Sequence, residues 1–216
     1  MYTYSTLPTP VRLIPLAVLL FIILVGGVAT QLLLAVILPP AAAPLAEPAH
    51  PGSISPLFTT EVRHWSSQIV QWSQAYDLDP NLVATVMQIE SCGDPEAVSS
   101  SGAQGLFQVM PFHFAEGENM RDPDTNARRG LEYLARGLSL AINKPGLALA
   151  GYNGGHSQIS KVWGSWPAET KRYYYWGSGI YAEASAGNDF SPTLEEWQKA
   201  GGASLCARAR TQLGLQ

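Results

Sequence analysis

Glu90 is the residue whose type and position most directly suggest acid–base chemistry. It ends the segment 80–91, in which Leu82, Val86 and Met87 recur at the spacing of the buried face of a helix. Glu90 follows Val86 by four positions and Met87 by three, so it continues that face. Burial raises the pKa of a carboxyl group, and we therefore expect Glu90 to hold a proton near neutral pH and to act as a general acid. An isolated glutamate at a helix end more often turns to solvent, so this prediction depends on the residues around it.

Other chemistries find little support in the composition. The chain has 216 residues, a net charge of −4, four scattered histidines and two cysteines far apart in the sequence. Neither residue type has the spacing of a metal site, and no cluster of lysine and arginine suggests a nucleic-acid surface. We therefore expect no metal, no other cofactor, no nucleic-acid partner, and a monomer.

The residues that follow Glu90 carry a longer pattern. The run 90–111 contains Glu-Ser, then Pro-x-Ala-x-Ser, then Gly-Ala-x-Gly-Leu-x-Gln-x-Met-Pro. This run resembles, without gaps, the signature of the soluble lytic murein transglycosylase (SLT) domain family, lysozyme-like enzymes that cut the glycan strands of bacterial peptidoglycan. Three later stretches of the chain also resemble elements of the family. They are Asp122-Pro-x-x-Asn, Gly151-Tyr152-Asn153 (with glycine where the family has alanine) and Glu169-Thr-x-x-Tyr173. The resemblance covers roughly residues 58–181, and its length and fixed spacing make it far more specific than a short motif.

The resemblance implies a mechanism with one carboxylate. Most glycosidases use two, whereas in this family one glutamate, here Glu90, protonates the oxygen of the β-1,4 bond between N-acetylmuramic acid and N-acetylglucosamine. It then deprotonates the C6 hydroxyl of the same muramic acid, which closes on C1 to give a 1,6-anhydro end. An attacking group within the substrate already has a high effective concentration. The resemblance also assigns substrate-side roles: Ser99, Gln108 and Met110 line the sugar subsites, Tyr152 lies across the cleft near Glu90, Asn153 supports it by hydrogen bonding, and Glu169 is a substrate-side residue.

Two alternative functions stay open at this stage. A lysozyme-like hydrolase would need an additional acid, and Asp94 and Glu96 in the loop after Glu90 are expected to be solvated. A non-catalytic glycan-binding protein of the cell wall would have no need of a desolvated acid. His113 and His156 could lie near the cleft, and we expect core packing for at least two of the four aromatic residues at 173–176.

The elements that must position these residues are predicted to be helical. Helices are expected from Thr59 or Thr60 to Trp72, over 80–91 with Asp79 as N-cap, over a short stretch at 103–110, from Asp122 to Ala141, before 151–155, over 169–181 and over 193–210. No alternating strand pattern of convincing length occurs, so strands amount at most to a small hairpin. The fold is therefore predicted to be mostly α, a lysozyme-like helical domain.

The N-terminal part predicts a membrane anchor. Residues 13–38 carry no charge and are long enough to cross a hydrocarbon core of about 30 Å. Arg12 indicates that residues 1–12 are cytoplasmic and that the remainder is exported. The predicted organisation is then a transmembrane helix at 13–38, a Pro/Ala-rich linker at 39–57, the SLT domain at 58–186 and a C-terminal helical extension at 187–216. A cleaved signal peptide, which would make the protein secreted, is the alternative, but the apolar run is longer than a typical signal segment.

Cys92 and Cys206 are candidates for a disulfide. An exported protein with an even cysteine count is expected to pair its cysteines. The bond would pin the C-terminal helix beside the loop that follows Glu90 and would order that segment by closing a long loop. The alternative is two unrelated free thiols.

Overall fold

A computed structural model describes residues 52–216. The predicted membrane segment 13–38 and the linker up to residue 51 lie outside the described residues. Within residues 52–216, no helix has the length and apolar character needed to cross a membrane.

The described part of the chain is mostly helical, as the sequence predicts, and contains no β-strand beyond two isolated β-bridges. Its α-helices are α2 (Thr60–Arg63), α3 (Ser66–Ala75), α4 (Pro80–Glu90), α5 (Pro123–Leu140), α6 (Pro145–Gly154), α7 (Ala168–Ser185), α8 (Pro192–Trp197) and α9 (Ala203–Leu213). Short helices η1 (Pro111–His113), η2 (His156–Gln158), η3 (Trp163–Ser165) and η4 (Gln198–Gly202) lie between them.

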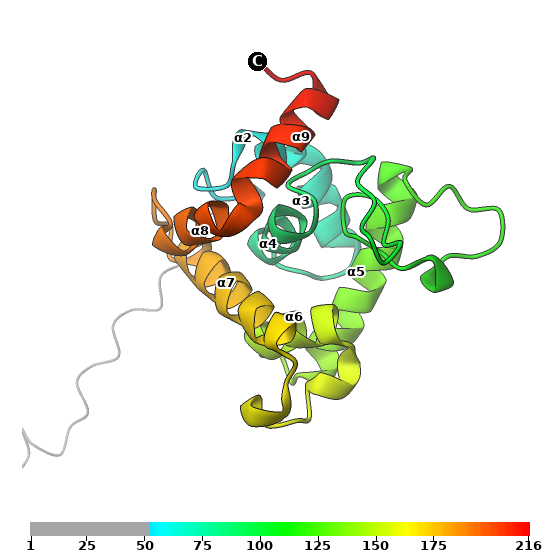
Figure 1. The fold of residues 1–216 in the computed structure, drawn as a ribbon, viewed down its shortest axis with the longest axis vertical. Helices are drawn as coiled ribbons and strands as arrows, with labels where there is room; N and C mark the ends of the chain where they lie inside the picture. Colours follow the sequence, from blue (N-terminus) through cyan, green and yellow to red (C-terminus); the bar gives the residue numbers. More distant parts are fainter. Residues whose placement is uncertain (1–51) are drawn as a thin grey trace, which may run out of the picture. The chain divides into compact units, whose positions relative to one another are not determined.

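Helix α4 forms the centre of this arrangement, with α3, α5, α7 and α9 around it (Figure 1). Residues 81–88 of α4 are all buried. The Asp79 carboxylate caps the helix by accepting from the backbone N–H of Asn81 at 2.8 Å and also accepts from the Tyr181 hydroxyl of α7 at 2.9 Å. Because α4 is fixed along its length and at its start, its last residue, Glu90, has a defined position.

The stretch 103–110 is not the short helix that the sequence predicts. Gly105 and Gln108 have φ values of 71° and 45°, in the left-handed region that ends an α-helix. The chain forms tight turns there with two isolated β-bridges, Val98 to Gln104 and Gln104 to Val109.

The buried side chain of Asn126 takes the place of helical hydrogen bonds in these turns. Its Oδ1 accepts from the N–H of Phe107 at 2.8 Å, and its Nδ2 donates to the carbonyls of Gln104 (2.7 Å) and Met120 (2.8 Å). A Cβ at Gly105 would lie 2.6 Å from this amide, so only glycine fits beside it. The prediction fails because a partner distant in sequence satisfies the local backbone.

Two other predicted helices are interrupted. The helix expected from Thr59 or Thr60 to Trp72 is divided into α2 and α3 by non-helical backbone at Trp65. The helix expected over 193–210 is kinked at Gly201, which has a φ of 128° and lies inside η4, between α8 and α9. At the kink, Gly202 packs so closely on the ring of Trp197 that a Cβ would collide with it.

The C-terminal helix α9 is attached to the core by two contacts. A disulfide joins Cys206 of α9 to Cys92, two residues after Glu90. Arg210 forms an ion pair of 2.6 Å with Glu61 of α2, whose side chain is only 1% exposed. The extension therefore packs against the segment that holds Glu90.

Candidate active site

Glu90 is the last residue of α4 and is partly buried. Desolvation by its surroundings raises the pKa of its carboxyl from 4.5 to about 8, and the charge of Glu169 adds to the rise. Glu90 therefore holds its proton at neutral pH, as the position on the apolar face of α4 predicts.

Two tyrosines, the buried Tyr173 and the partly buried Tyr152, lie near this carboxyl. The Tyr152 hydroxyl of α6 donates to the carbonyl of Phe107 at 2.8 Å, and burial followed by the charge of Glu90 raises its pKa. The hydroxyl of Tyr173, a residue 5% exposed, faces Glu90 without completing a hydrogen bond, and its dipole opposes the rise of the Glu90 pKa. Its own pKa is also raised by burial and by Glu90.

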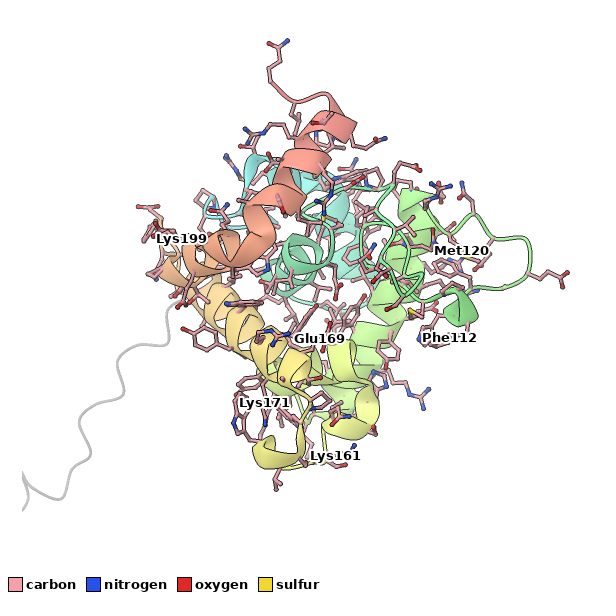
Figure 2. All side chains as sticks on the ribbon, viewed as in Figure 1. Phe112, Met120, Lys161, Glu169, Lys171 and Lys199 are labelled. Atoms are coloured by element: carbon pink, nitrogen blue, oxygen red, sulfur yellow. A yellow bond between two sulfur atoms is a disulfide. The ribbon has the colours of Figure 1, made fainter. Side chains whose placement is uncertain are left out.

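Tyr173 is the site residue that sequence reasoning missed. It closes the Glu-Thr-x-x-Tyr element, but that element directs attention to Glu169, and the aromatic run at 173–176 is typical of core packing. The available signal is the spacing: Tyr173 follows Glu169 by one helical turn, so both lie on the same face of α7. Glu169 is exposed in the first turn of α7, at the end nearest α6 (Figure 2).

The turns at 97–110 position the predicted polar residues. Gln108 donates through Nε2 to the carbonyls of Ala97 (3.1 Å) and Gly105 (3.0 Å), which leaves its Oε1 available as an acceptor. The Ser99 hydroxyl accepts from the N–H of Ala103 at 2.9 Å, so its hydrogen can still be donated. Both side chains are thus fixed by backbone contacts before any ligand binds.

Asn153 is oriented by α7. Its Oδ1 accepts from the hydroxyl of Thr170 at 3.1 Å, so its Nδ2 donor is left for other partners. Gly154 passes so close to the Thr170 side chain that a Cβ would lie 2.5 Å from the hydroxyl oxygen. This close packing of α6 on α7 holds Asn153 in place.

A cavity of about 290 Å³ brings part of the predicted set together. Its lining includes four predicted residues, Gln108, Met110, Tyr152 and Asn153, together with Val109, Phe112, His113, Gly130, Tyr133, Gly154 and Gly155. The cavity lining does not include Ser99, Glu169 or Glu90. One lining residue, Tyr152, has its pKa raised in part by the charge of Glu90.

The carboxylates of the loop after Glu90 are engaged in local structure. Asp94 is buried, contrary to the expectation that it is solvated, and its side chain accepts from the backbone N–H of Glu96 at 2.9 Å. Glu96 is exposed and pairs with Arg121 at 2.7 Å. Both carboxylates therefore already have a hydrogen-bonding or ionic partner within the fold.

Comparison with known proteins identifies the class of this domain. The family model of the Transglycosylase SLT domain matches residues 67–175, half of the chain, and the chain belongs to this family. The matched residues include α4, α5, α6 and the cavity.

Two curated proteins and one solved structure are similar to this chain over part of their length. A transglycosylase of Enterobacteria phage PRD1 is 38% identical over 111 residues, which make up 50% of this chain and 40% of the phage protein. Membrane-bound lytic murein transglycosylase C of Edwardsiella ictaluri is 30% identical over an alignment of 113 residues, and the match covers 43% of this chain and 32% of that protein. An inactive mutant of lytic transglycosylase Slt from Pseudomonas aeruginosa has a solved structure with 20% identity and a TM-score of 0.40, covering 68% of this chain and 24% of its own. The chain thus spans less than half the length of these relatives.

Proposed function

We propose that this protein is a lytic transglycosylase that cleaves the β-1,4 bond between N-acetylmuramic acid and N-acetylglucosamine in peptidoglycan without water. The observation that carries the proposal is Glu90, a carboxyl with a pKa raised to about 8 that lies near the buried Tyr173 and the partly buried Tyr152 in an SLT domain. A residue that only binds glycan gains nothing from being kept protonated, whereas a general acid requires it.

The reaction follows from the two states of this one carboxyl. Protonated Glu90 donates its proton to the glycosidic oxygen while the bond from that oxygen to C1 of the muramic acid breaks, which leaves positive charge at C1. The resulting Glu90 carboxylate is a strong base because the same desolvation raises its proton affinity. It takes the proton of the C6 hydroxyl, and O6 closes on C1 to form the 1,6-anhydro ring. Glu90 is restored, and no water is consumed.

The tyrosines have distinct roles in this scheme. Tyr173 carries a buried hydroxyl without a hydrogen-bond partner, placed to donate to Glu90 when its carboxyl becomes charged. Tyr152 is held by the Phe107 carbonyl at 2.8 Å, lines the cavity and lies close enough to Glu90 for that charge to raise its pKa, so it links the acid to the sugar site. Gln108, Met110 and Asn153 then hold the sugar rings in the cavity, and Ser99 and Glu169 contact the strand beyond it.

The membrane location is a separate part of the proposal. The uncharged run 13–38 would anchor the protein and place the SLT domain outside the cytoplasm. The name of one relative, the lytic murein transglycosylase C of Edwardsiella ictaluri, describes it as membrane-bound. Fractionation of cells that produce the full chain or a variant lacking residues 13–38 tests it, since the proposal requires only the full chain to sediment with membranes.

The catalytic proposal is tested by the full chain acting on purified peptidoglycan. We expect Glu90→Gln to lower the rate of release of soluble fragments by about 100- to 10,000-fold while the variant still co-sediments with peptidoglycan. Glu96→Gln, which changes an exposed glutamate of the neighbouring loop, should keep the rate within a few-fold of wild type. Unchanged release by Glu90→Gln would refute the role of Glu90. A wild type that binds peptidoglycan without releasing fragments would instead identify a glycan-binding protein.

A further inference from the structure

The segment that holds η3, before α7, presents an apolar tip on the surface. Residues 160–165 are all exposed, and within them Val162 is 75% and Trp163 is 51% exposed. The other five tryptophans of the sequence are buried or half-buried. Single exposed apolar side chains are common, but an exposed tryptophan beside an exposed valine forms an apolar patch, and such patches mark protein or membrane interaction surfaces.

Two other rings support Trp163. Its ring centroid lies 5.4 Å from that of Trp166 and 5.6 Å from that of Tyr174 on α7, and these two rings lie 5.3 Å apart. Trp166 is buried and donates through Nε1 to the carbonyl of Gln158 at 2.9 Å. Trp163 therefore rests on a packed base, and a partner that binds it orders the side chain at little cost in conformational entropy.

Cationic side chains lie around this tip. Lys161 is exposed directly before it, and the Nζ of Lys171 on α7 lies 5.7 Å from the centroid of the Trp163 ring. Arg172, the next residue of α7, is also exposed. Figure 2 shows Lys161 and Lys171 at the same end of the domain. We call this set of five residues the basic aromatic patch: Lys161, Val162, Trp163, Lys171 and Arg172.

The charge of this patch is opposite to that of the whole protein. The segment 156–176 contains three cationic side chains and one carboxylate, that of Glu169, which gives a net charge of +2, whereas the chain carries −4. Neither Val162 nor Trp163 lines the cavity beside Tyr152, so the patch is separate from the site assigned to the sugar rings. Tryptophan flanked by lysine and arginine suits the boundary between lipid headgroups and acyl chains, where the ring is partly buried and the cations meet anionic lipid.

The length of the preceding chain favours a bilayer as the partner. Thirteen residues, 39–51, separate the predicted membrane segment 13–38 from Gly52, the first described residue. Even fully extended, thirteen residues span at most about 45 Å. A short tether holds a domain near its target at an effective concentration on the order of millimolar, so a weak contact is sufficient.

We propose that the basic aromatic patch docks on the surface of an anionic phospholipid bilayer. Val162 and Trp163 enter the boundary between headgroups and acyl chains, while Lys161, Lys171 and Arg172 contact the lipid phosphates. This second contact fixes which side of the SLT domain faces the bilayer. The inference rests on the membrane location in the proposed function, because the anchor brings the patch to the lipid.

Tryptophan fluorescence tests the docking in the full chain. The protein is reconstituted into vesicles whose phospholipids carry bromine on the acyl chains near the headgroup, which quenches a tryptophan that reaches it. Residues 1–51 contain no tryptophan, so the signal comes only from the described domain. We expect quenching on vesicles that contain phosphatidylglycerol and little on phosphatidylcholine alone. Trp163→Phe should remove it, because the other tryptophans are buried or half-buried.

A charge reversal keeps the fluorescent reporter and weakens the contact. Each cationic side chain near an anionic surface strengthens binding about 5-fold, so Lys161→Glu, which changes the charge by two units, should lower the ratio of docked to undocked domain about 25-fold. The matched control is Lys199→Glu, which makes the same change at an exposed lysine in another part of the domain (Figure 2). It should leave the quenching as in wild type.

Retention of the chain on the vesicles is measured in parallel by flotation. A chain that stays on the vesicles without quenching would overturn the docking surface and keep the anchor. Equal quenching on neutral and anionic vesicles would also overturn it, as would equal effects of Lys161→Glu and Lys199→Glu. A chain that leaves neutral vesicles but is quenched by anionic ones would reject the anchor and keep the docking surface.

Discussion

Replacing Glu90 with glutamine should make the folded domain more stable at neutral pH, even though it removes the proposed catalyst. The folded state raises the pKa of Glu90 from 4.5 to about 8. Between these two values the folded state holds a proton that the unfolded chain has lost, so the free energy of unfolding falls as the pH rises. The stabilising contribution of this proton is complete below pH 4.5 and is lost as the pH rises through about 8.

The size of the effect follows from the shift. At pH 7, about 2.5 units above the ordinary pKa, each unit corresponds to about 1.36 kcal/mol, which gives about 3 kcal/mol for a fully desolvated group. Solvent at the exposed part of Glu90 screens its charge, so we expect the wild type to lose about 1–3 kcal/mol through this group between pH 4.5 and pH 7. Glutamine has no proton to lose, and the variant should not show this component.

The assay is urea unfolding of residues 52–216, followed by circular dichroism at a series of pH values for wild type and Glu90→Gln. The informative quantity is the difference between the two free energies of unfolding, since other groups affect both proteins alike. The same difference for Glu96→Gln measures the general effect of removing one acidic side chain. A difference for Glu90→Gln that stays constant with pH, or that favours the wild type as the pH rises, would refute the claim that burial keeps this carboxyl protonated.

Three further predictions concern activity and the C-terminal extension. The rate of peptidoglycan cleavage should fall as the pH rises above about 8, because Glu90 then loses the proton it must donate; a pH–rate profile that already falls near 4.5 would contradict this. Arg210→Ala should lower the free energy of unfolding by about 2–4 kcal/mol, because it leaves Glu61 buried without its partner. The control, Lys199→Ala, breaks an exposed ion pair and should lower the free energy of unfolding by less than about 0.5 kcal/mol. Equal effects of the two substitutions in denaturant titrations would show that burial is unimportant for the Arg210–Glu61 pair. Cys206→Ser should cost about 3–5 kcal/mol in the same assay, because the disulfide closes a loop with a sequence separation of 114, and an unchanged unfolding midpoint would contradict that role.

The helices that fix Glu90 could be predicted because their signals are local. Asp79 followed by Pro80 marks the start of α4, and the apolar spacing of that helix places Glu90 on its buried face. The pairing of Cys92 with Cys206 follows from the even cysteine count, which is also independent of the fold.

The rest depends on contacts between distant residues, which a local pattern does not contain. The stretch 103–110 has a helix-like composition, but the Asn126 amide satisfies its backbone in turns instead. The role of Tyr173 requires knowing that α7 packs against the end of α4. The rings of His113, Tyr133 and His156 pack together from η1, α5 and η2, and no single segment of sequence shows that they meet.

The central claim, that one carboxyl cleaves the strand by an attack from within the substrate, is tested most directly by digesting peptidoglycan in water enriched in heavy oxygen. Mass spectrometry of the fragments then reports both the product and the source of its oxygen. The account predicts anhydro-muropeptides, each lighter by one water than the reducing sugar, with no heavy oxygen at the new C1 end. Reducing ends that carry the heavy isotope would contradict it, because water and not the C6 hydroxyl would then have attacked C1.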